Sequence, residues 1–206
     1  MLGKRVLLVE GRDDEHVVKS ICGRFGLGKI DIRQKTGIEP LLESLPVQLR
    51  ESDIAALGII LDADTDLAAR WQAVADRLTS AGYNGLGARP DESGAIVMPP
   101  PGQNLLPKVG IWVMPNNRVP GLLEDFLQFL VPEGDSLLPK ARQIIGELPE
   151  RKFSIFHESK ALIHTWLAWQ EEPGRPYGQA ITARYLDADL PLGKVFASWL
   201  RRTFFE

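Results

Sequence analysis

The stretch IAALGIILDADTD, residues 54–66, joins a run of apolar and small residues to three aspartates at alternating positions. The run from Ile54 to Leu61 predicts a buried strand. Because side chains alternate along an extended chain, Asp62, Asp64 and, if the strand geometry persists, Asp66 are expected on one side. Carboxylate oxygens suit hard divalent cations, so this junction predicts a site for Mg²⁺ or Mn²⁺.

A second junction of the same kind lies near the beginning of the sequence. The short apolar run Arg5-Val6-Leu7-Leu8-Val9 ends in Glu10-Gly11. If this strand and the one over 54–61 are parallel neighbours, their carboxyl ends share the sheet edge at which α/β folds bind ligands. We therefore expect Glu10 to meet the aspartates.

Strand and helix patterns alternate over the first two-thirds of the chain, which predicts an α/β fold with a mostly parallel sheet flanked by helices. From residue 83 to 108 the chain is rich in glycine and proline, and we assign this loop or hairpin no chemistry. Beyond residue 131 only helical periodicity remains. We expect an α/β domain over 1–133 and a helical C-terminal subdomain over 134–206. The expected strands are 5–9, 29–33, 54–61, 95–98 and 109–114, and the expected helices are 13–25, 40–49, 67–79, one beginning near 122, 137–148, 158–170, 179–186 and 192–205.

The two junctions resemble the motifs of the Toprim domain, which occurs in topoisomerases, bacterial primases, recombination mediators and OLD-type nucleases. The first motif is a strand ending in Glu-Gly, here Glu10-Gly11, and the second is a strand ending in Asp-x-Asp, here Asp62-Ala63-Asp64. The resemblance covers roughly the first two-thirds of the chain. It implies a Toprim-like sheet, Mg²⁺ or Mn²⁺ bound by Glu10, Asp62 and Asp64, and Glu10 as a general acid or base.

The resemblance to the OLD-type branch extends to three further residues. A second acid often follows the motif glutamate by four positions, and Asp14 stands there. A further acidic element follows Asp-x-Asp, and Glu124, in the first turn of an expected helix beside Asp125, is our candidate; the alternative is that Glu124 only stabilises the helix dipole. OLD-type nucleases also place a lysine near the scissile phosphate. Lys160 is the candidate for that role, against the commoner case of an exposed helix lysine.

The string Leu-Asp-Ala-Asp occurs again at residues 186–189. The residues before this second copy have helical rather than strand character, and Pro191 begins the next expected helix. We interpret the second copy as a loop between helices with capping acids, so the context of the first copy carries the metal prediction.

Composition restricts where and how such a site would act. The formal net charge of −3 excludes binding of nucleic acid by bulk electrostatics, so any contact with DNA or RNA must be local. No apolar run approaches the roughly 20 residues that cross a bilayer, and no secretory signal is recognisable, so a cytoplasmic protein without membrane contact is expected. The single cysteine, Cys22, lies in an apolar pattern and is interpreted as a packing residue.

These observations favour metal-dependent hydrolysis of phosphodiester bonds in nucleic acid, DNA more than RNA, by a chain that acts alone, as a homodimer or with a protein partner. One alternative is a non-catalytic, metal-stabilised binding or regulatory module that acts through a partner protein. Two others are a receiver-like phosphoacceptor domain and a haloacid-dehalogenase-like phosphatase, because both place an aspartate after a strand. The chain is too short to carry the additional parts of a topoisomerase or primase as well.

Overall fold

A computed structural model describes residues 3–103 and 105–206 and contains one five-stranded sheet in the order β2-β1-β3-β5-β4. Four strands are parallel, and β4 pairs with β5 in the antiparallel sense. The sheet is flanked by helices, as the sequence predicts. The strands are β1 (Lys4–Val9), β2 (Asp31–Gln34), β3 (Ile54–Asp62), β4 (Ala95–Val97) and β5 (Lys108–Met114).

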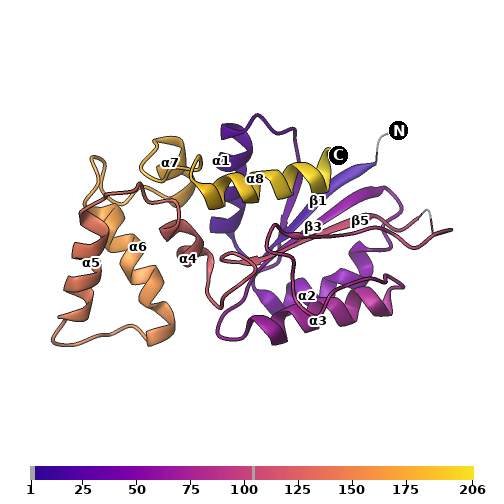
Figure 1. The fold of residues 1–206 in the computed structure, drawn as a ribbon, viewed down its shortest axis with the longest axis horizontal. Coiled ribbons are helices and arrows are strands. Elements are labelled where there is room, and N and C mark those ends of the chain that lie inside the picture. Colours follow the sequence, from indigo (N-terminus) through magenta and orange to yellow (C-terminus); the bar gives the residue numbers. More distant parts are fainter. Residues whose placement is uncertain (1–2, 104) are drawn as a thin grey trace.

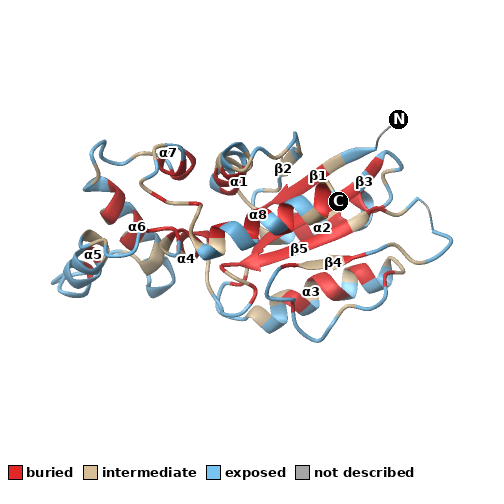
Figure 2. Ribbon diagram, turned by 45° about the horizontal axis from the view of Figure 1, so that its top comes forward, coloured by how far each residue is buried: buried red, intermediate tan, exposed pale blue. Residues whose placement is uncertain are grey.

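Helices cover both faces of the sheet (Figure 1). Helices α1 (Arg12–Arg24) and α8 (Pro191–Phe204) pack on one face, and α2 (Ile38–Gln48) and α3 (Leu67–Ser80) pack on the other. Figure 2 shows β1, β3 and β5 as almost continuously buried. Burial on both faces is the reason that these strands are apolar throughout and do not alternate with polar residues.

The remaining helices form a lobe beside the sheet (Figure 1). They are α4 (Leu123–Gln128), α5 (Leu137–Gly146), α6 (Glu158–Ala168) and α7 (Tyr177–Thr182). The chain then returns to the sheet in α8, where Phe196 meets the ring of Trp112 edge-on with centroids 5.0 Å apart. One hydrophobic cluster runs from Leu7 of β1 to Leu162 of α6 and Phe196. Helix α8 thus completes the core of the sheet, and the division expected at residue 133 stays a prediction.

Helix α8 lies unusually close to the sheet at two glycines. A Cβ atom on Gly110 would stand 2.2 Å from Oγ1 of Thr203, and one on Gly58 would stand 2.5 Å from the ring of Phe204. Larger residues at these strand positions would push the helix away. The close packing of α8 on the sheet thus depends on these two glycines.

The glycine- and proline-rich segment over 83–108 contains the edge strand β4 and is held by side chains at both ends. The hydroxyl of Tyr83 donates to the carbonyl of Pro107 at 2.7 Å, and the indole of Trp71 donates to the carbonyl of Gly87 at 2.9 Å. Asn104, in this segment, lies outside the described residues. No helix in the described part of the chain is long and apolar enough to cross a bilayer.

The order of the strands fixes the position of the two acidic junctions. Strands β1 and β3 are adjacent and parallel, with Leu7 opposite Gly58, as expected. Strand β2 lies on one side of β1, and β3 lies on the other side, so the strand order reverses between β1 and β3. The crevice at the carboxyl ends of these two strands is therefore the topological switch point. Glu10 and Asp62 therefore occupy the place where open α/β sheets bind ligands.

Candidate metal centre

Glu10 and Asp62 are held together by a hydrogen bond between neighbouring strand ends. The backbone N–H of Asp62 donates to Oε1 of Glu10 at 2.8 Å. The Asp62 carboxylate in turn accepts, through Oδ1, the backbone N–H of Leu123 at the start of α4, at 2.9 Å. Three segments, the ends of β1 and β3 and the beginning of α4, are thus joined through two carboxylates. The expectation that Glu10 meets the aspartates is confirmed for Asp62.

Asp14 reaches the same region from the first turn of α1. Its Oδ2 accepts the backbone N–H of Gly11 at 3.0 Å, which caps the helix. Asp14 is only 9% exposed, whereas its neighbour Asp13 is exposed. Of the acids in this turn, it is therefore Asp14 that faces inward toward Glu10.

At the start of α4 the structure distinguishes two neighbouring acids. Asp125 accepts the N–H of Leu122 at 2.8 Å and caps α4. Glu124 is buried and its Oε1 accepts the hydroxyl of Tyr177 at 3.2 Å. The ammonium of Lys160, on α6, lies 3.6 Å from the same oxygen and is half-exposed. Asp125 is therefore the residue that caps α4. Glu124 and Lys160 both lie at the sheet edge where β3 ends in Asp62.

Mutual repulsion and burial make these carboxylates hard to ionise without a cation. Burial raises the pKa of Asp62 well above its ordinary value, and the charges of Asp14, Glu10 and Glu124 raise it further. Burial, with Glu10 and Glu124 nearby, raises the pKa of Asp14 to about 7. The pKa of Glu10 is raised by burial, against the lowering effects of the Asp62 N–H and Arg70. When these groups ionise, the cluster therefore carries negative charge that nearby protein groups only partly balance.

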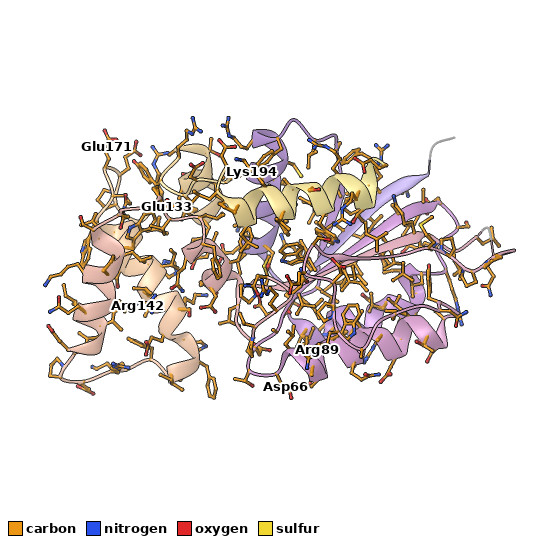
Figure 3. All side chains as sticks on the ribbon, in the orientation of Figure 1. Asp66, Arg89, Glu133, Arg142, Glu171 and Lys194 are labelled. Carbon is orange, nitrogen blue, oxygen red and sulfur yellow. The ribbon has the colours of Figure 1, made fainter. Side chains whose placement is uncertain are left out.

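Asp64 and Asp66 do not continue the strand, which ends at Asp62. Asp64 has a positive φ of 50°, so the alternation that would align it with Asp62 stops there, and its carboxylate pairs with the guanidinium of Arg70. Asp66 caps α3 by accepting the N–H of Ala69 at 2.9 Å. Figure 3 shows Asp66 at the outer margin of the molecule, near Arg89. The condition attached to Asp66 is not met, because the strand does not persist to it. The regular alternation also stops at Asp64, but the charge of Asp64 still raises the pKa of Glu10 and of Asp62, so its assignment as a metal ligand stays a prediction.

The donor set suits a hard divalent cation. Glu10, Asp14, Asp62 and Glu124 offer only carboxylate oxygens, the ligands of Mg²⁺ and Mn²⁺. In the ranges 3–103 and 105–206, no three His, Cys, Asp or Glu side chains are grouped tightly enough to hold one ion together. Mg²⁺ usually keeps several waters and takes only one or two carboxylates directly, so a closed cage is not needed. The four carboxylates fit such an ion by their chemistry and by their unbalanced charge.

Several neighbours of this site carry no signal in the sequence. Tyr177, on the short helix α7 of the lobe, places its hydroxyl between Glu124 and His164. The hydroxyl oxygen lies 3.0 Å from Nε2 of His164. Arg70, one turn into α3, contacts Asp64. Neither residue belongs to a motif, and only the packing of the lobe and α3 against the strand ends brings them here.

Cys22 is partly buried, as the sequence predicts for a packing residue. Burial raises the pKa of its thiol to about 11, which disfavours the thiolate that a nucleophile requires.

The second Leu-Asp-Ala-Asp lies between α7 and α8, and within the described residues its aspartate side chains bond no carboxylate of the candidate metal centre. Asp187 accepts the N–H of Asp189 at 3.0 Å, and Asp189 pairs with Arg24 and Arg184. The location between helices is confirmed. The expected capping of α8 by an acid was wrong, because the N-cap residue is Leu190, which makes no side-chain capping hydrogen bond.

Comparison with known proteins places the chain by family only. A family model described as "Protein of unknown function (DUF3226)" matches residues 4–205, which is nearly the whole sequence. No curated protein and no solved structure matches the chain. The chemistry must therefore be argued from the site itself.

Proposed function

We propose that this chain, which belongs to the DUF3226 family, is a divalent-metal-dependent phosphodiesterase that cleaves nucleic acid in the manner of Toprim nucleases. Glu10, Asp14, Asp62 and Glu124 would hold one or two Mg²⁺ or Mn²⁺ ions, and Lys160 would contact the phosphate.

One observation carries the proposal. Buried and partly buried carboxylates from four separate segments converge on the switch point of the sheet, and the pKa values of Glu10, Asp14 and Asp62 are raised there. Burying like charges is destabilising unless the site serves a ligand of opposite charge. A divalent cation neutralises the repulsion, and an anionic phosphate can then approach a site whose bare charge would repel it.

The residues of the chain have separable tasks in this mechanism. The bound metal would supply Lewis-acid stabilisation of the charge that develops on the phosphate oxygens. Glu10 Oε1 and Asp62 Oδ1 are fixed by backbone N–H groups, and no described residue forms a hydrogen bond with the second oxygen of either side chain. Glu10, whose raised pKa moves its titration toward neutrality, is suited to transfer a proton. The Lys160 ammonium is half-exposed beside Glu124 and can pair with a phosphate oxygen.

The test is metal-dependent cleavage of labelled single- and double-stranded DNA and RNA by the wild type, Glu10→Gln and Asp62→Asn. Binding of Mn²⁺ to each protein is measured by calorimetry. We expect Mn²⁺-dependent cleavage by the wild type, a loss of at least 10²-fold in both variants, and weaker metal binding by Asp62→Asn.

The chain supplies its own matched control in the second Leu-Asp-Ala-Asp. Asp187→Asn makes the same chemical change in the same tetrapeptide, but between helices, where the Asp187 side chain accepts the N–H of Asp189. It should cleave and bind metal as the wild type does. Equal cleavage by all the proteins would indicate a contaminating nuclease and refute the proposal. Metal binding without cleavage would instead favour the non-catalytic module that acts through a partner.

A further inference from the structure

A groove of about 670 Å³ lies directly beside the metal centre. It is lined by Asp64, Gly121, Leu122 and Asp125 from the strand ends, and by Phe156 and His157 from the segment that leads into α6. The N–H of Asp64 bonds the carbonyl of Gly121 at 3.0 Å, which joins the loops after β3 and β5. Leu122 immediately precedes Leu123, whose N–H holds Asp62. A molecule in this groove is therefore next to any phosphate at the centre.

Phe156 is the unusual feature of this groove. Its side chain is 65% exposed, and Ile155 beside it is 67% exposed. Both belong to a single 3-10 turn, η1 (Ile155–His157). The hydroxyl of Ser159 donates to the Asp125 carboxylate, which ties the beginning of α6 to the cap of α4. The aromatic ring is thus presented to solvent by a segment anchored to the opposite wall of the groove.

Three cations, Arg151, Lys152 and Lys160, stand within five residues of Phe156 in the sequence. Arg151 pairs with Glu158, the residue after His157, at 3.0 Å, and Lys160 lies 3.6 Å from Glu124. The groove itself is lined by Asp64 and Asp125, so these cations and a bound metal ion would meet the phosphates outside the groove while a base occupies it. A flat apolar ring next to basic residues is the combination that single-stranded nucleic acid recognises, because a base stacks on the ring while its phosphates contact the cations.

We propose that the groove receives an unpaired nucleobase stacked on Phe156, so that the substrate of the metal centre is a single strand or a single-stranded end. This inference deepens the proposed nuclease function and depends on it. A base held in a duplex is stacked between its neighbours and cannot reach the ring. The phosphate adjoining the stacked base then lies toward Asp62 and Lys160. Phe156 thus selects the form of the strand, and the metal centre performs the cleavage.

The test is binding, measured by fluorescence anisotropy with a fluorescein-labelled 16-nucleotide single strand, its duplex, and a 16-unit abasic strand. Ca²⁺ replaces Mg²⁺, and a gel confirms that the strands stay intact. The wild type should bind the single strand at least tenfold more tightly than the duplex. Phe156→Ala should weaken that binding by about 5- to 150-fold, the range measured for loss of one base-stacking contact, and Phe156→Trp should retain it. Neither substitution should alter binding of the abasic strand.

Phe129→Ala is the matched control, because Phe129 is 49% exposed and lines other hollows of the surface. It should bind all three strands as the wild type does. Equal binding by Phe156→Ala and the wild type would overturn the stacking proposal, and if the wild type still cleaves with Mn²⁺, the proposed nuclease function stands alone. A wild type that neither binds nor cleaves overturns both. A loss of self-association in Phe156→Ala, with strand binding intact, would make the groove an interface between copies and would equally overturn the proposal.

Discussion

Replacing Asp14 by asparagine should stabilise the protein when metal is absent. The pKa of this carboxyl is raised from 3.8 to about 7 by burial and by Glu10 and Glu124. A shift of roughly 3 units corresponds to about 4 kcal/mol at the most, at about 1.4 kcal/mol per unit. Asparagine has nearly the same shape and can still accept the N–H of Gly11. We therefore expect Asp14→Asn to raise the free energy of unfolding by about 2–4 kcal/mol at pH 8 in EDTA.

The direction of the pH dependence follows from proton binding. Between about pH 4 and pH 7 the folded protein holds a proton on Asp14 that the unfolded chain has released. The stability of the wild type should therefore fall as the pH rises through this window. Below pH 4 the carboxyl is protonated in both states, so the advantage of Asp14→Asn should fall to within about 1 kcal/mol.

Urea unfolding at pH 4, 6 and 8, in EDTA and with Mg²⁺, measures these quantities. The control is Asp13→Asn in the same helical turn, whose side chain is exposed. It loses the same interaction with the helix dipole, worth about 0.3–1 kcal/mol, without relieving buried charge. Mg²⁺ should stabilise the wild type at pH 8 more than Asp14→Asn. A difference between wild type and Asp14→Asn that is equal at pH 4 and pH 8 would refute the reasoning.

Three further substitutions test the centre and the fold. Lys160→Ala should lower the rate of cleavage by about 10²-fold. It should leave Mn²⁺ affinity and stability nearly unchanged, because the half-exposed ion pair of Lys160 with Glu124 contributes little to folding. A loss of metal binding measured by calorimetry would contradict this assignment. Gly110→Ala should destabilise by about 1–3 kcal/mol in urea unfolding, since its Cβ would overlap Thr203, and unchanged stability would show that α8 packs less closely on the sheet. Phe196→Ala should cost about 3–5 kcal/mol by the same measurement, because its ring is fully buried; a cost below about 1 kcal/mol would count against α8 as part of the core.

Local patterns in the sequence were sufficient for the elements of the fold and for the first half of the site. Short apolar runs rich in β-branched residues indicate strands buried on both faces, and adjacent parallel strands end at the same edge of a sheet. These two constraints brought Glu10 to Asp62 across 52 positions of the chain. They also predicted the α/β class, which the structure shows.

The resemblance suggested Asp14 and Glu124 as further acids, but only the tertiary structure brings their charges close to that pair. In the sequence Asp13 and Asp14 are equally acidic, and only the rotation of α1 against the sheet buries one of them. Asp64 departs from the alternation of β3 through a single backbone angle, a positive φ just after the strand that no spacing rule reveals. Tyr177 reached Glu124 across 53 positions because the lobe folds back on the strand ends. Periodicity reports which face of an element is apolar, whereas the neighbour of a given side chain depends on how whole elements pack.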